Sequence, residues 1–249
     1  MKVQKIKSRG IVFTFYMDNY PTNVFVINGK DHYFVCDTFL GPEPMEKLKH
    51  YLIYTYGKNP FIVINSHYHW DHIWGNCAFD SDIISHVLCR KAIAQKGEQE
   101  LQEYSAYQQG TVKLVLPTIT FTDALLYPDE DIEIVYTPGH TADSVSVIDH
   151  TDQTIFVGDN VEAPIPYLFY ENLKEYIKTL QYYLDMDIET IIPGHGTIPE
   201  KLLIQKNLEY VKAFVDNDTK EYETEIYQPI HAMNKKIQDE IELKRKQYL

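Results

Sequence analysis

His67-Tyr68-His69-Trp70-Asp71-His72 is the strongest signal in the sequence. It places three imidazoles and one carboxylate close together, and these are the ligands that zinc and related first-row metals take. In an extended backbone His67 and His69 point to the same side, while Asp71 and His72 can turn toward a second ion as the chain enters a helix. A histidine-rich surface loop is the alternative interpretation. Because four neighbouring donors exceed what one tetrahedral ion takes from a tight loop, the stretch predicts a two-metal site.

Outward from this stretch, metal-capable side chains again follow apolar strands at three later positions. Residues 61–64 form an apolar run that predicts a buried strand, and α/β folds place their sites where such strands end. Further on, an apolar strand is followed three times by a glycine and a metal-capable side chain, and glycine lets the backbone bend tightly or approach a site closely. Each position alone is a weak signal, since a lone histidine after glycine is commonly a surface residue. Together the stretch and these positions supply seven donors: His67, His69, Asp71, His72, His140, Asp159 and His195.

The rest of the chain alternates strands and helices. Period-two and period-3.6 patterns predict strands over residues 11–16, 23–27, 33–37, 82–85, 118–121, 132–136, 144–148, 154–157 and 190–192. They predict helices over residues 44–56, 90–104, 171–184 and 199–215, and from about residue 230 onward. The Asn28-Gly29 pair predicts a tight hairpin, and Trp70 and Trp74 are expected in the core. Two packed sheets with helices outside would accommodate this order.

Length and charge limit the classes of protein and partner. The 249 residues fit one large domain over residues 1–215, with a charged helical tail over 216–249 that packs on the same domain. A net charge of −13 repels phosphate backbones, so we expect no nucleic-acid partner. No apolar run approaches the about 20 residues that cross a bilayer, and the start lacks an apolar leader. Three cysteines without a C-x-x-C pair favour a reducing cytoplasm.

The spacing H-x-H-x-D-H over residues 67–72 resembles the signature of the metallo-β-lactamase superfamily, and the resemblance extends over about residues 20–200. It implies an α/β (α+β) fold, a four-layer αββα sandwich with the metals at one edge. It implies that Asp159 bridges two metals, the first held by His67, His69 and His140 and the second by Asp71, His72 and His195. Asp37 resembles an early acidic position that orients ligands or a loop; a turn-capping aspartate is the alternative.

Departures from other members narrow the choice within the superfamily. Many zinc β-lactamases have a cysteine where Asp159 stands and are exported, and flavodiiron relatives have a glutamate where His69 stands. RNA-processing relatives carry extra nucleic-acid-binding elements. The layout is similar to glyoxalase II-like thioesterases and lactonases, although no basic cluster for glutathione follows His195. Persulfide dioxygenases share much of the motif but use a single iron.

The sequence therefore predicts a metal-dependent hydrolase with two divalent ions, zinc in first place and iron or manganese as alternatives. Two such ions about 3.5–4 Å apart lower the pKa of a shared water, and the bridging hydroxide would attack a small ester, thioester or lactone. Asp71 and Asp159 are the predicted catalytic residues, and Tyr167, in the stretch 163–170, is expected to line the pocket as a hydrogen-bond donor, with ordinary loop packing as the alternative. An iron-dependent redox enzyme, a phosphodiesterase and a metal-holding scaffold are the competing hypotheses. We expect a small-molecule partner and no membrane partner. The sequence leaves open whether the chain forms a homo-oligomer.

Overall fold

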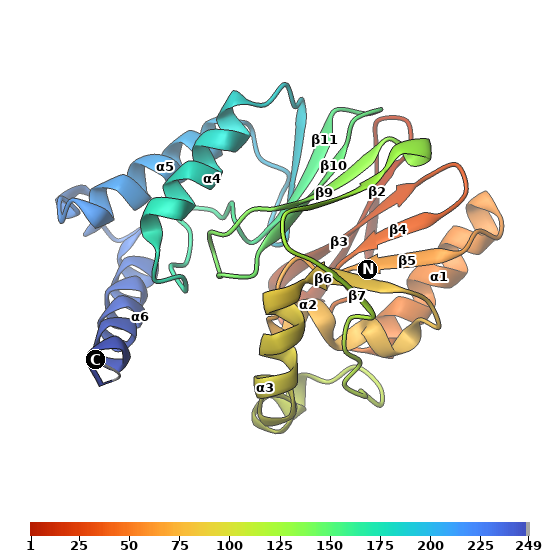
Figure 1. The fold of residues 1–249 in the computed structure, drawn as a ribbon, viewed down its shortest axis with the longest axis horizontal. Helices are drawn as coiled ribbons and strands as arrows, with labels where there is room; N and C mark the ends of the chain where they lie inside the picture. The colour runs from red at the N-terminus through yellow and green to blue at the C-terminus, as the bar shows by residue number, and fades with distance from the viewer. Residues whose placement is uncertain (248–249) are drawn as a thin grey trace.

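Two β-sheets face each other at the centre of the molecule, and helices cover the outer face of each sheet (Figure 1). The computed structural model describes residues 1–247. One apolar core lies between the sheets, and one lies under the helices on each outer face. Burial of apolar side chains on both faces of each sheet is what this layering requires. The predicted αββα sandwich is confirmed.

The first sheet contains seven strands in sequence order: β1 (Lys2–Ile6), β2 (Gly10–Met17), β3 (Tyr20–Asn28), β4 (Tyr33–Cys36), β5 (Phe61–Ile64), β6 (Ile83–His86) and β7 (Ile119–Phe121). The strands from β1 to β4 are antiparallel, and those from β4 to β7 are parallel. Parallel neighbours need crossover connections, which contain α1 (Pro42–Tyr56), α2 (Trp70–Ile73) and α3 (Val87–Glu103). Short 3₁₀ helices follow α2 and α3, as η1 (Trp74–Ala78) and η2 (Ser105–Tyr107). The ends of β4 and β5 therefore lie at the same edge of the sheet.

The second sheet contains five strands in the order β12 (Thr190–Pro193), β11 (Thr154–Gly158), β10 (Val145–Asp149), β9 (Ile132–Tyr136) and β8 (Ala124–Tyr127). A 3₁₀ helix, η3 (Pro128–Glu130), connects β8 and β9. Helices α4 (Leu173–Asp185) and α5 (Leu202–Val215) cover the outer face of this second sheet. An isolated bridge between Thr22 and His195 brings β3 of the first sheet against the end of β12. This contact joins the two sheets beside the predicted site.

Two strands and one turn differ from the sequence prediction. The sequence pattern predicts no strand at β1 or β8, because both are edge strands whose side chains are mostly exposed or half-buried and lack a buried apolar face. The hairpin at Asn28-Gly29 forms, but Asn28 pairs with Tyr33, so the connection is longer than a two-residue turn. The amide of Gly29 donates to the His32 carbonyl at 2.9 Å and closes it.

The predicted charged tail contains η4 (Lys220–Tyr222) and α6 (Gln228–Gln247), and its last residues, 248–249, lie outside the described residues. α6 buries His231 and Asn234, and His231 Nδ1 lies 3.1 Å from the Tyr210 hydroxyl of α5. The division of the chain at residue 215 stays a prediction.

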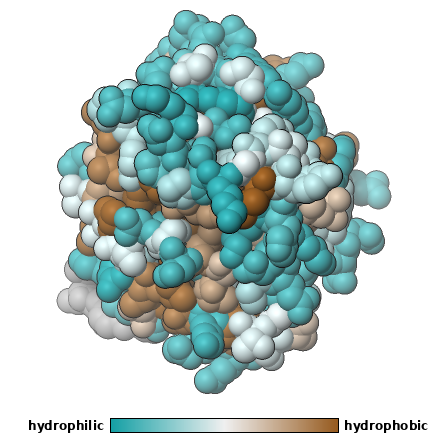
Figure 2. Space-filling view, turned by 90° about the vertical axis from the view of Figure 1, so that its right-hand side faces the viewer, coloured by the Kyte–Doolittle hydropathy of each residue, from teal (hydrophilic) through white to brown (hydrophobic). Residues whose placement is uncertain are grey.

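The surface agrees with an acidic, polar chain. Hydrophilic residues cover the larger part of the face in Figure 2. Across residues 1–247, no helix has the length and apolar character that crossing a membrane requires. Cys36, Cys77 and Cys89 are free thiols, two of them buried.

Candidate metal centre

All seven predicted metal ligands converge at one edge of the sandwich. They come from segments that follow four strands, because each strand ends at this edge and delivers the next residues to it. His67 and His69 follow β5, Asp71 and His72 lie in α2, and the later strands deliver His140, Asp159 and His195. The structure groups their ligand atoms into two sets, His67, His69, His140 with Asp159, and Asp71, His72 with His195.

Three imidazole nitrogens of the first set face one another. The Nε2 atom of His67 lies 3.0 Å from His69 Nδ1, and His140 Nε2 lies 3.2 Å from the same Nδ1 atom. A tetrahedral zinc ion with bonds of about 2.0–2.1 Å holds its nitrogen ligands about 3.3 Å apart. The spacing of these three nitrogens therefore fits one ion of this kind.

The second set has the same spacing. The Nε2 atoms of His72 and His195 are 3.1 Å apart. The Oδ2 atom of Asp71 lies 3.3 Å from His195 Nε2 and 3.5 Å from His72 Nε2. Two imidazoles and a carboxylate in this arrangement fit a second ion with an open position.

Asp159 stands between the two sets. Its Oδ2 atom lies 3.6 Å from His67 Nε2 and 3.7 Å from His140 Nε2. The same oxygen lies 3.3 Å from His72 Nε2 and 3.2 Å from His195 Nε2. Its Oδ1 atom is buried and has no hydrogen-bond partner among the described residues. Because a buried carboxylate is costly without partners, the orphaned Oδ1 and the central place of Oδ2 together fit a carboxylate whose charge is balanced by cations.

Hydrogen bonds behind the ligands turn their free nitrogens toward the centre. The Nδ1–H group of His72 donates to Asp37 Oδ2 at 2.8 Å, and that of His195 donates to the Pro21 carbonyl at 3.1 Å. With the proton on Nδ1, the Nε2 lone pair of each ring is available to a metal. Asp37 is fully buried and also accepts from the amide and hydroxyl of Ser66, both at 2.7 Å. It therefore contacts the predicted ligand His72 from behind, and its orienting role stays a prediction.

Charges at the centre alternate in a way that suits cations. Burial and the neighbouring His140 imidazole lower the pKa of His69 to about 3, so this ring is neutral near pH 7. Burial opposes ionisation of Asp159, but nearby imidazoles, His195 foremost, hold the pKa of its carboxyl well below its ordinary value. Burial would also lower the pKa of His195, yet Asp159 and Asp71 raise it to about 10. A proton thus occupies His195 where a metal ion would take its place.

We expect Asp37→Asn to weaken metal binding without unfolding the chain. Asparagine keeps the side-chain size and tolerates the left-handed backbone of residue 37, where φ is 64°, but it removes the charge that holds His72. Loss of such an outer partner costs about 10–100-fold in metal affinity. Competition with a chromogenic zinc chelator measures this loss, and Asp218→Asn, at an exposed carboxylate in the loop between α5 and η4, is the control. Equal affinities in both variants would contradict an orienting role for Asp37.

Gly158 explains how β11 delivers Asp159. Its φ of +51° lies in the left-handed region, which glycine adopts at no steric cost. A Cβ atom there would lie 2.8 Å from Ser66 Oγ. The glycine before the carboxylate is therefore required by both conformation and space.

A cavity of about 340 Å³ opens beside the metal ligands. Tyr167 is among the residues that line it, and its role as a hydrogen-bond donor to a substrate stays a prediction. Trp74 is buried in the core, as expected, whereas Trp70 is half-buried: it packs against the same core, lines the cavity and stacks on Tyr104 at 4.7 Å between ring centroids. Further aromatic and acidic residues that the sequence pattern does not predict also line the cavity: Tyr20, Tyr68, Glu100, Tyr104, Glu162 and Phe169.

Some of the missed residues contact the ligands directly. The Phe169 ring lies 5.2 Å from the rings of both His69 and His140, and the Tyr20 ring lies 4.6 Å from that of His195. The Glu162 carboxylate lies 3.5 Å from His140 Nδ1. The aromatic loop that pointed to Tyr167 also contains Phe169 and could have identified it, whereas nothing in the sequence near Tyr20 or Glu162 marks either residue.

Comparisons with known proteins agree with this geometry. The chain is similar to the human Acyl-coenzyme A thioesterase MBLAC2, at 24% identity over 73% of this chain and 75% of that protein. It is 27% identical to the Atrochrysone carboxyl ACP thioesterase of Pseudocercospora fijiensis (strain CIRAD86), over 77% of this chain but only 52% of that relative. The crystal structure of the DIM-1 metallo-beta-lactamase superposes with a TM-score of 0.70 at 20% identity, covering 86% of this chain and 97% of that one, which shows the shared fold.

The family model of the Metallo-beta-lactamase superfamily matches residues 17–195. The match ends at the last predicted ligand, His195, and contains the other six. With the fold, the order of the strands and this match in agreement, the chain belongs to the metallo-β-lactamase superfamily.

Proposed function

We propose that this protein is a hydrolase that uses two divalent metal ions, zinc foremost, to cleave the thioester of a small acyl group. The observation that carries the proposal is the convergence of seven donor side chains in two sets, with Asp159 between them, beside an open cavity. Thioesters stand first among the candidate substrates because two relatives are named as thioesterases. Oxygen esters and lactones are the alternatives in the same reaction class.

The first ion would be held by His67, His69 and His140 and the second by Asp71, His72 and His195, with Asp159 shared. When bound, two divalent cations would lower the pKa of a shared water and stabilise an oxyanion developing on the substrate.

The chain's own residues would position the reactants. Asp159 would fix the separation of the two metal positions from its central place. Asp71 is the more exposed of the two carboxylates, at 14% against 5%, and lines the cavity, so it would face the bound substrate as well as bind metal. Burial and Glu162 raise the pKa of Tyr167, which keeps its hydroxyl protonated as a donor to the substrate. Phe169 covers the His69 and His140 rings and would exclude water from them.

Metal removal and restoration test the proposal. We expect two zinc ions per chain by elemental analysis, release of thiol from an acyl thioester, loss of that activity in a chelator, and recovery when zinc is returned. Thiol release can be followed with a colorimetric thiol reagent, and a panel of oxygen esters, lactones and phosphodiesters defines the substrate class. One iron per chain with oxygen uptake on a persulfide would favour the redox hypothesis and overturn the hydrolase.

A further inference from the structure

Two side-chain amides of α6 hold the main chain of the loop that forms one wall of the cavity. Asn234 Oδ1 accepts from the Leu168 amide at 3.0 Å, and its Nδ2 atom donates to the Pro166 carbonyl at 2.8 Å. One helical turn later, Gln238 Nε2 donates to the carbonyls of Leu168 at 2.7 Å and Tyr170 at 3.0 Å. Residues four apart lie on the same helix face, so two neighbouring side chains of α6 hydrogen-bond to this short segment.

These hydrogen bonds determine where the aromatic side chains of the loop lie. Leu168 is fully buried in the core under the helices, whereas its neighbours Tyr167 and Phe169 line the cavity. Successive side chains of an extended segment point to opposite sides, so fixing the main chain at 166–170 presents Tyr167 and Phe169 to the metal centre. The Tyr167 amide is held in addition by Glu162 Oε2 at 2.9 Å.

Asn234 is itself rigidly placed. It is completely buried, and its Nδ2 atom makes a second hydrogen bond to the Tyr210 hydroxyl of α5 at 2.8 Å. Both donors and the acceptor oxygen of the amide are therefore in use, which makes the position of the loop depend on α5 and α6 together. α6 lies outside residues 17–195, the part that matches the family model.

We propose that α6 is a specificity element of the active site, in which Asn234 and Gln238 are positioning residues that fix the Tyr167–Phe169 wall for substrate binding. This proposal rests on the proposed hydrolase function, because it assigns the loop to substrate recognition at that site. Neither amide touches the metal ligands, so their loss should loosen substrate binding and leave metal binding intact.

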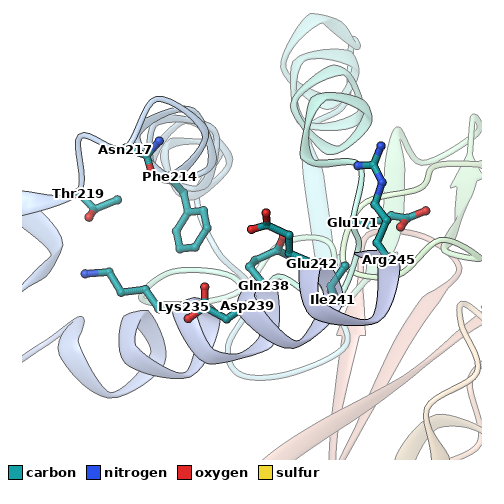
Figure 3. Close-up of a pocket in the computed structure, with 10 residues that line it drawn as sticks. All are labelled: Glu171, Phe214, Asn217, Thr219, Lys235, Gln238, Asp239, Ile241, Glu242 and Arg245. Carbon is teal, nitrogen blue, oxygen red and sulfur yellow. The ribbon is translucent and has the colours of Figure 1, made fainter. Parts of the chain in front are cut away.

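Gln238 is the better of the two positions for a test. It also lines a cavity of about 360 Å³ between the end of α5 and α6, shown with its lining residues in Figure 3. Methionine has a similar length and can rotate toward this space, so Gln238→Met removes two hydrogen bonds without crowding the core. Asn234, in contrast, also holds Tyr210, and its replacement would disturb α5.

For Gln238→Met we expect faster hydrogen–deuterium exchange in peptides covering residues 163–172, by roughly tenfold, as loss of hydrogen bonds to the loop permits local opening. On the thioester turned over by the wild type, we expect KM to rise about tenfold and kcat to change less than about twofold, the signature of lost substrate binding. Two metal ions per chain should remain. Gln238→Lys keeps a donor for the carbonyls, so its KM should lie close to the wild-type value. Lys236→Met, on the exposed face of the same helix, is the matched control.

The exchange measurement needs no substrate, so it separates this proposal from the hydrolase itself. Wild-type exchange rates in Gln238→Met would overturn the proposed positioning role of Gln238. Faster exchange with an unchanged KM would also overturn it, because the contact would then be structural only. A fall in kcat together with metal loss would also overturn it. A wild-type protein that binds metal but cleaves no thioester, ester or lactone would refute the proposed function. It would also refute the assignment of the α6 hydrogen bonds to substrate recognition.

Discussion

Asp159→Ala is expected to lower turnover by more than about 100-fold and to leave fewer than two metal ions per chain. Removal of an outer partner alone costs about 10–100-fold, and Asp159 has a nearer place, with one oxygen within 3.7 Å of four imidazole nitrogens. Without its carboxylate the two sets of ligands share no anion, and two cations held close together repel each other. Elemental analysis and thiol release by the purified variant measure both effects.

The variant must remain folded for this result to count. Asp152→Ala supplies the matched control, because Asp152 is also a buried carboxylate but bonds to the amides of Ser8 and Arg9, away from the centre. It should lower the melting temperature while retaining both metals and turnover. Full metal loading and near-normal turnover in Asp159→Ala would contradict the bridging position.

The convergence of the seven donor side chains could be predicted because its signals are local. Residues 67–72 carry four donors in one short segment, and three glycines precede the other donors directly. The strands that lead to them, such as β5 with its Phe-Ile-Val-Ile run, are buried almost throughout, so their apolar character is unambiguous. Edge strands such as β1 lack this signal because solvent covers most of their side chains.

The pocket is harder to predict because its walls come from long-range contacts. Tyr20 reaches His195 only because β3 and the end of β12 meet at the Thr22 bridge. The hydrogen bonds from α6 to the loop involve side-chain amides and main-chain groups, and an asparagine or a glutamine on a helix gives no sign of such a role. Substrate recognition therefore depends on tertiary packing that sequence periodicity does not encode.

Gly194→Ala is expected to disrupt the metal centre although Gly194 carries no ligand. A Cβ atom at this position would overlap Asp159 Oδ1 and would lie 3.0 Å from His72 Cε1. The backbone cannot retreat, because the Gly194 amide donates to the Gly158 carbonyl and its own carbonyl accepts from Asn23, both at 2.7 Å. Asp159 must then leave its central place, so we expect loss of at least one metal ion and more than about 100-fold of turnover, as for loss of a ligand. Overpacking should also cost about 1–3 kcal/mol of unfolding free energy.

Gly196→Ala separates this overlap from a general effect of added side chains near His195. Gly196 has a left-handed φ of +81°, but a Cβ atom there meets no other atom within 4 Å. Torsional strain should cost about 1–2 kcal/mol, with both metals and most turnover retained. Gly194 has no left-handed backbone, so backbone strain cannot explain a larger loss there, whereas the overlap with Asp159 and the close approach to the His72 ring can. Equal metal content in the two variants would show that Asp159 can move aside without releasing a cation, and the central position of its carboxylate would then not be what holds the two metals together.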